Sequence, residues 1–295
     1  MNHRHFENIL SVSPPEALLD EVLQILRLIS SDFNTEPIRD IFETTSRIYG
    51  GAYPGYRACN TAYHDLGHAN ATFLAMARLI HGAVLEGETL SESEIVAGLT
   101  AAILHDVGYI QQASDTQGTG AKYKVVHEQR SMDFLGRHGP EFGLSSEQIA
   151  AGQSIILCTK MAADMAAIAF PSAGIRLLGK LLGAADLLAQ LADRAYLEKL
   201  LYLYRECKEA GTGEFKNELE VFKKTVEFYD VFELRLKTVL DQSDRFMQPH
   251  FAARWNIDKD LYREAILGHQ DFLRKALKMK DPDLRRYLKD SGIVN

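Results

Sequence analysis

The stretch that decides the fold runs from residue 63 to residue 108; it opens with YHDLGH at 63–68 and closes with ILHDVG at 103–108. Between these two motifs, apolar residues recur every three or four positions, first from Ala69 to Val84 and then from Ile95 to Ile103. This spacing predicts two amphipathic helices. The first motif then lies at the start of one helix and the second at the end of the next, where packing of the two helices brings them together.

The polar residues of the two motifs form a candidate metal site. His64 and His68 are four positions apart, and we expect them on one face at the start of the first helix. His105 and Asp106 end the second helix, with Gly108 as the stop signal. Imidazole and carboxylate groups that converge from two packed helices suit a divalent cation. For the His-Asp doublet alone, a capping aspartate beside a core histidine is the alternative.

A further helix carries an isolated carboxylate. Asp186 is the only charged residue in the apolar run 181–192, and Leu178 and Leu182 lie on its face. An ionised carboxylate that faces a core needs a cation or a tight set of hydrogen bonds. Asp186 is therefore a candidate ligand, and Gln190, one turn later, is expected to face the same pocket.

Composition limits the class of protein and partner. Of the 295 residues 25% are charged and 46% hydrophobic, which is ordinary for a soluble globular protein. The net charge of −7 argues against long nucleic acid as a partner and favours a small substrate. Cys59, Cys158 and Cys207 are widely spaced, which indicates reduced thiols. With no signal-peptide core and no long apolar span, we expect a cytoplasmic protein without a membrane partner.

The fold is predicted to be all-α, because alternating strand patterns are absent. We expect residues 13–210 to form the main helical domain and residues 211–295 a helical extension, which braces the core or makes a homodimer contact. Ser13 is the predicted N-cap of the first helix, and Ser145 opens a capping box. The polar segment 111–124 is predicted to be a loop, either covering the substrate or lying uncommitted on the surface.

The combined motifs resemble the HD superfamily of metal-dependent phosphohydrolases, and within it the branch that contains the cyclic-nucleotide phosphodiesterases. The similarity covers about residues 55–195 and implies an HD-domain helical bundle, phosphoester hydrolysis and one or two divalent ions, with Mg, Mn, Zn and Fe all open. His64 is then a proton donor that is not bound to the metal, although its spacing from His68 would also allow both to bind one ion. The resemblance implies four ligands for the principal ion, namely His68, His105, Asp106 and Asp186.

Other residues are candidates for a second ion or for the substrate. His127 begins a predicted helix at about the point where some HD proteins place an extra ligand or substrate contact, and a half-buried structural histidine is the alternative. Lys124 could face a phosphate. Thr159 lies in the stretch 156–161, which resembles the segment that lines the pocket of the phosphodiesterases.

The expected function is hydrolysis of a small phosphoester, a phosphodiester or a nucleotide-type molecule, by a metal-activated water. Two alternatives use the same scaffold. An HD-type di-iron oxygenase would need more histidines around a second ion. A non-catalytic sensor would bind a nucleotide through a surviving metal site.

Overall fold

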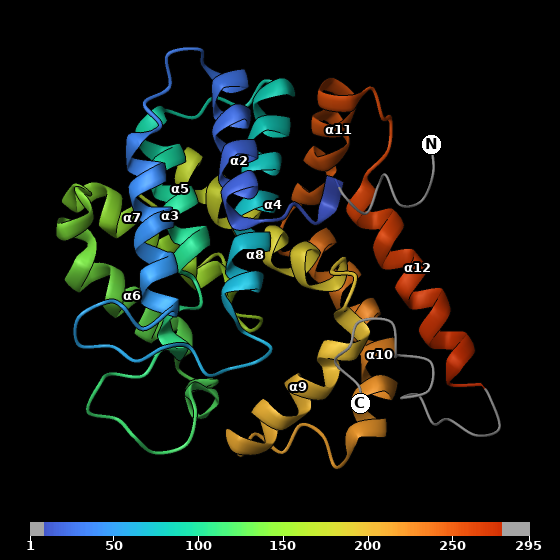
Figure 1. The fold of residues 1–295 in the computed structure, drawn as a ribbon. Helices are drawn as coiled ribbons and strands as arrows, with labels where there is room; N and C mark the ends of the chain where they lie inside the picture. The colour runs from blue at the N-terminus through green and yellow to red at the C-terminus, as the bar shows by residue number, and fades with distance from the viewer. Residues whose placement is uncertain (1–8, 279–295) are drawn as a thin grey trace.

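The computed structural model describes residues 9–278, and within this range the chain forms helices and no strand, as the sequence predicts. Figure 1 shows the helices stacked around a central group, with the last ones along one side. The α-helices are α2 (Pro15–Ile29), α3 (Glu36–Tyr49), α4 (Leu66–Leu85), α5 (Glu92–Leu104), α6 (His127–His138), α7 (Ser146–Ile156), α8 (Ala173–Leu191), α9 (Tyr196–Glu209), α10 (Glu218–Thr238), α11 (Met247–Trp255) and α12 (Leu261–Ala276).

Short 3₁₀ helices connect several of these elements. They keep the connections compact, because each adds one tight turn without lengthening a helix. They are η1 (Val107–Tyr109), η2 (Gly120–Tyr123), η3 (Gly139–Phe142), η4 (Leu157–Thr159) and η5 (Ser243–Phe246).

The centre of the molecule is α4, which packs against α2, α5, α8 and α11 (Figure 1). Nearly every side chain from His68 to Ala83 is buried. The sequence predicted an amphipathic helix here, but α4 is covered on almost all sides. Alanines at positions such as Ala75 and Ala77 allow this, because small side chains let neighbouring helices approach closely.

Two predicted helix starts have different outcomes. The capping box at Ser145 is confirmed, since its side chain accepts from the backbone N–H of Gln148 and the Gln148 side chain accepts from Ser145. The prediction that Ser13 caps the first helix is wrong. Pro14 occupies the N-cap in an extended conformation, and its carbonyl accepts the first helical bonds, so the helix begins at Pro15.

The extension after residue 210 packs on the main domain through α11, which lies against α4, through α12, which lies against α8, and through α10. Arg235 is buried and donates hydrogen bonds to three carbonyls in the segment that follows α7: those of Cys158 at 2.9 Å, Lys160 at 3.0 Å and Met161 at 2.6 Å. The division of the chain at residue 210 stays a prediction, and the last part of the extension lies outside the described residues, as does the chain start before Ile9.

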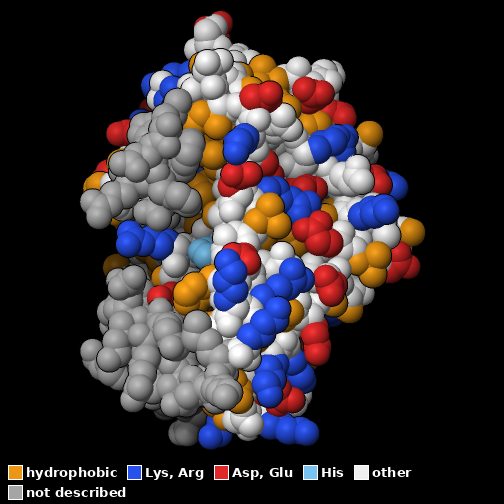
Figure 2. All heavy atoms as spheres, turned by 90° about the vertical axis from the view of Figure 1, so that its right-hand side faces the viewer, with side chains coloured by type: hydrophobic (Ala, Val, Ile, Leu, Met, Phe, Trp, Pro, Cys, Tyr) orange, Lys and Arg blue, Asp and Glu red, His pale blue; other side chains and the backbone are white. Residues whose placement is uncertain are grey.

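Within residues 9–278, no helix combines the length and the apolarity that crossing a lipid bilayer requires. Figure 2 shows the face that carries α12, where Lys and Arg side chains are interspersed with acidic ones and with scattered apolar groups.

Gly82 on α4 and Gly268 on α12 provide a matched test of this packing. A Cβ at Gly82 would lie 1.8 Å from the backbone oxygen of Phe246, whereas a Cβ at Gly268 would meet nothing within 4 Å. Gly82→Ala should therefore destabilise the fold by about 3 kcal/mol, and Gly268→Ala should stabilise it by about 0.5–1 kcal/mol through helix propensity. Urea unfolding followed by circular dichroism measures both. Equal effects would contradict the close approach of α4 and η5.

Candidate metal centre

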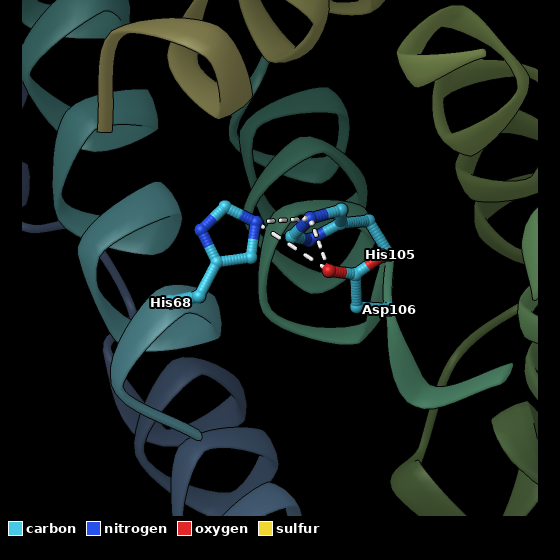
Figure 3. A group of neighbouring side chains, drawn as sticks. All are labelled: His68, His105 and Asp106. Carbon is cyan, nitrogen blue, oxygen red and sulfur yellow. Dashed lines mark hydrogen bonds and ion pairs between the residues drawn. The ribbon is translucent and has the colours of Figure 1, made fainter. Parts of the chain in front are cut away.

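Three helices bring the predicted ligands together. His68 lies in the first turn of α4, His105 and Asp106 directly follow α5, and Asp186 lies on α8. These helices pack against one another. Figure 3 shows the His68 ring pointing across to His105 and to the carboxylate of Asp106. The structure brings His68, His105 and Asp106 into one buried cluster with Asp186 beside both histidines, and their role as metal ligands stays a prediction.

Asp106 and Asp186 each place a carboxylate oxygen close to the imidazole nitrogens of His68 and His105. The Nε2 atoms of His68 and His105 are 3.3 Å apart. Asp106 Oδ2 lies 3.4 Å from the former and 3.3 Å from the latter, and Asp186 Oδ1 lies 3.0 Å and 3.6 Å from the same two nitrogens. Metal–ligand bonds of about 2.0–2.2 Å place neighbouring ligands roughly 2.8–3.6 Å apart around a four- or six-coordinate ion. The five distances fit that range.

The chemistry of the cluster also fits a cation. His105 Nδ1 lies 2.8 Å from the carbonyl oxygen of Ala102. When Nδ1 carries the proton and donates it to this carbonyl, the lone pair on Nε2 faces the cluster. A metal-bound histidine is usually arranged in this way. Asp106 Oδ2 is buried and has no hydrogen-bond donor in the described part of the chain. A buried carboxylate oxygen without a donor is costly unless a cation meets it.

The electrostatics point the same way. Burial alone would lower the pKa of the His105 imidazole, but the carboxylates of Asp106 and Asp186 outweigh it and raise that pKa well above its usual value. The pKa of Asp186 is lowered: burial opposes this, but bonds from His105 and His68 prevail. A site that draws a proton onto a buried imidazole holds a strongly negative potential, which equally favours a metal cation.

His64 does not occupy the expected position on the helix. The side chain of Asp65 accepts the backbone N–H of His68 at 2.8 Å, which caps α4 and makes Leu66 its first residue. His64 therefore precedes the helix, and the expectation that it shares a helix face with His68 is wrong. The two rings still lie near each other, with centroids 6.1 Å apart.

The partner of His64 is a residue that the sequence did not indicate. Nδ1 of His64 lies 2.6 Å from Oε2 of Glu206 on α9, and the other oxygen of Glu206 accepts the backbone N–H of Tyr63 at 2.7 Å. Burial would raise the pKa of Glu206, but the bond from His64 outweighs it and lowers that pKa. Glu206 lies in a charged helix far along the chain, and no local pattern in the sequence distinguishes it from the other carboxylates there.

His127 lies on the other side of Asp106. Its Nε2 is 3.5 Å from Asp106 Oδ1, and its Nδ1 is 2.7 Å from the carbonyl oxygen of Lys124. The two oxygens of Asp106 thus face different imidazoles. Burial lowers the pKa of His127, which favours the neutral ring that a metal ligand requires.

Gly108 has a different role from the predicted helix stop. Helix α5 ends at Leu104, and Gly108 lies in η1 without a left-handed backbone conformation. A Cβ at this position would be 2.0 Å from the carbonyl oxygen of His127. Glycine is required here because η1 passes directly against the start of α6, and this close passage sets the position of His127.

A cavity of about 550 Å³ opens beside the cluster. Asp106, Asp186, His64 and His127 line it, together with residues from α9 and α10. Three further side chains that the sequence placed near the substrate also line it, namely Lys124, Thr159 and Gln190.

The loop that leads to Lys124 is held in place by its own charged residues. Lys122 bonds to Asp115 at 2.6 Å, and Arg130 donates to the carbonyls of Gly108 and Ile110. The ammonium of Lys124 makes no hydrogen bond or ion pair with any residue between Ile9 and Lys278. Of these three cations, Lys124 alone lines the cavity.

The sequence matches no protein-family model, and a search of curated proteins finds no match. The buried His-His-Asp cluster and the helical fold are compatible with an HD-type site, and they are what supports a functional assignment.

Metal uptake tests the ligand set. Chelator-treated protein titrated with Mn²⁺ should bind it, and Asp186→Asn or Asp106→Asn should weaken binding by at least ~100-fold, because changes outside the ligand shell alone cost about 10–100-fold. Asp193→Asn, two residues beyond the end of α8, is the matched control and should bind as the unmodified protein does. Unchanged affinity in Asp186→Asn would remove Asp186 from the ligand set.

Proposed function

We propose that this protein is an HD-type metal-dependent phosphohydrolase that acts on a small phosphoester, of the phosphodiester or nucleotide type. The observation that carries the proposal is the buried cluster of His68, His105 and Asp106, with Asp186 beside both histidines, next to a cavity that Asp106, Asp186 and His64 line. Ligands for a cation and a separate imidazole then face the same space, which is the combination that phosphoester hydrolysis needs.

The four clustered residues would hold the principal ion. Asp106 and His127 would hold a second ion, since Oδ1 of Asp106 lies 3.5 Å from Nε2 of the His127 imidazole. A bound divalent ion supplies Lewis acidity at the phosphoryl oxygens and lowers the pKa of a coordinated water.

His64 would protonate the leaving oxygen. Glu206 would hold the proton on Nδ1, so that the proton on Nε2 is the one passed to the substrate. The ring is held in place by stacking on Tyr109, with centroids 4.4 Å apart, and by the bond of Thr61 to the His64 carbonyl at 2.7 Å. When the leaving oxygen takes this proton, Glu206 stabilises the position of the neutral ring until water restores the proton.

The donor role predicts a specific pattern of losses. His64→Gln should keep normal metal content and lose about 10²–10⁴-fold in turnover of an alkyl phosphoester, the usual scale for general acid catalysis. The loss should shrink for a nitrophenyl ester, whose leaving group needs little protonation. Turnover with the two esters and metal content by elemental analysis are measured in parallel, with His269→Gln as the control histidine.

Glu206→Gln gives an independent check, because it keeps the shape of the side chain. It should lower turnover of the alkyl ester, and it should add little to the loss in His64→Gln if both act as one unit. Additive losses, or loss of metal from His64→Gln, would contradict the assignment of His64 as a donor oriented by Glu206.

A further inference from the structure

The cavity beside the metal centre has two chemically different ends. One end holds Asp106, Asp186 and the imidazoles, together with the ammonium of Lys124. Lys124 is tied to this end by its carbonyl oxygen, which lies 2.7 Å from Nδ1 of His127. The other end is formed by α9, α10 and the segment before α10, and its apolar lining residues are Tyr196, Leu200, Leu203, Phe215 and Phe228.

The polar groups at the apolar end are already bonded within the protein. Thr225 donates to the carbonyl of Val221 at 2.9 Å. Glu214 accepts from the Cys207 thiol at 2.9 Å, and its carbonyl accepts from the ammonium of Lys224 at 2.5 Å.

Thr212 completes this set, since its hydroxyl donates to the carbonyl of Cys207 at 3.3 Å. A ligand at this end therefore meets hydrocarbon and aromatic rings. Ribose hydroxyls placed there would lose their hydrogen bonds to water without replacement.

Two side chains at this end are only half-buried. Leu203 on α9 and Phe228 on α10 both line the cavity and retain exposed apolar surface. Both side chains also pack against the core, and the apolar surface that they leave open gains free energy when a ligand covers it. The cavity also suits a small molecule, because its volume lies within the usual range for such ligands.

The geometry points to a phosphoester whose organic group is compact and apolar, aryl or short alkyl, as the ligand of this cavity. The phosphoryl group lies at the end with Lys124 and the metal ligands, and the organic group lies against Leu203 and Phe228. This inference rests on the proposed function and narrows its substrate class: esters with an apolar group bind better than sugar phosphates and nucleotides.

The test is binding of phosphonates, which cannot be hydrolysed, to the Mn²⁺-loaded protein by calorimetry. Methylphosphonate, butylphosphonate and phenylphosphonate are compared with adenosine monophosphate as the hydrophilic probe. Each buried methylene strengthens binding about fourfold, so butylphosphonate should bind at least tenfold more tightly than methylphosphonate. Phenylphosphonate should also bind more tightly than the nucleotide. Equal affinity for the two alkyl probes, or preference for the nucleotide, overturns the inference.

Variants locate the effect. Phe228→Asn should reduce the preference for butylphosphonate over methylphosphonate to about threefold or less, because one apolar wall is lost. Leu234→Asn is the matched control: Leu234 lies on the same helix but is 61% exposed and does not line the cavity. It should keep the full preference. A preference that Phe228→Asn leaves unchanged places the apolar group elsewhere and contradicts the assignment.

Hydrolysis assays separate this inference from the proposed function. Naphthyl phosphate and glucose 6-phosphate are tested as substrates with the same Mn²⁺-loaded protein. If the protein binds the apolar phosphonates more tightly but hydrolyses no phosphoester, the cavity assignment is supported and the enzyme proposal is contradicted. If both esters are hydrolysed at equal kcat/KM and the apolar phosphonates bind no more tightly than the hydrophilic probe, the cavity assignment is contradicted and the enzyme proposal stands.

Discussion

One carboxylate oxygen of Asp106 and one of Asp186 lie 3.0–3.6 Å from the imidazole nitrogens of His68 and His105 inside a helical core, and the rest of the structure depends on these contacts. Such an arrangement is costly without positive charge at its centre, because burial weakens the solvation of each carboxylate. The start of α4, the end of α5 and the middle of α8 must all meet there. The close packing of α4 with its neighbours provides the rigidity that fixed ligand geometry requires.

A second layer of contacts connects the cluster to the later part of the chain. Glu206 on α9 orients His64, and Tyr109 lies against both His64 and His127. Arg235 on α10 holds three carbonyls of the segment whose residues line the cavity. The helices after residue 195 therefore do more than brace the core, since α9 and α10 form part of the cavity wall.

Local patterns in the sequence predicted most of the helices and the four clustered residues. Motif spacing predicted that His68, His105 and Asp106 lie close together. An isolated charge in an apolar run predicted that Asp186 lies near them. The position of His64 was wrong because a side-chain cap at Asp65 decides where α4 begins. Glu206 could not be found, since it reaches His64 across 142 positions of sequence. Gly108 was misread because close approach to His127 is a tertiary constraint without a local signature.

The central claim is that these four side chains bind one divalent ion. Anomalous diffraction from crystals soaked in Mn²⁺, recorded on both sides of the metal absorption edge, tests it directly. The account predicts a peak about 2.0–2.2 Å from His68 Nε2, His105 Nε2, Asp106 Oδ2 and Asp186 Oδ1. A fully soaked crystal with no peak at this position, or with a peak held only by surface carboxylates, would contradict it.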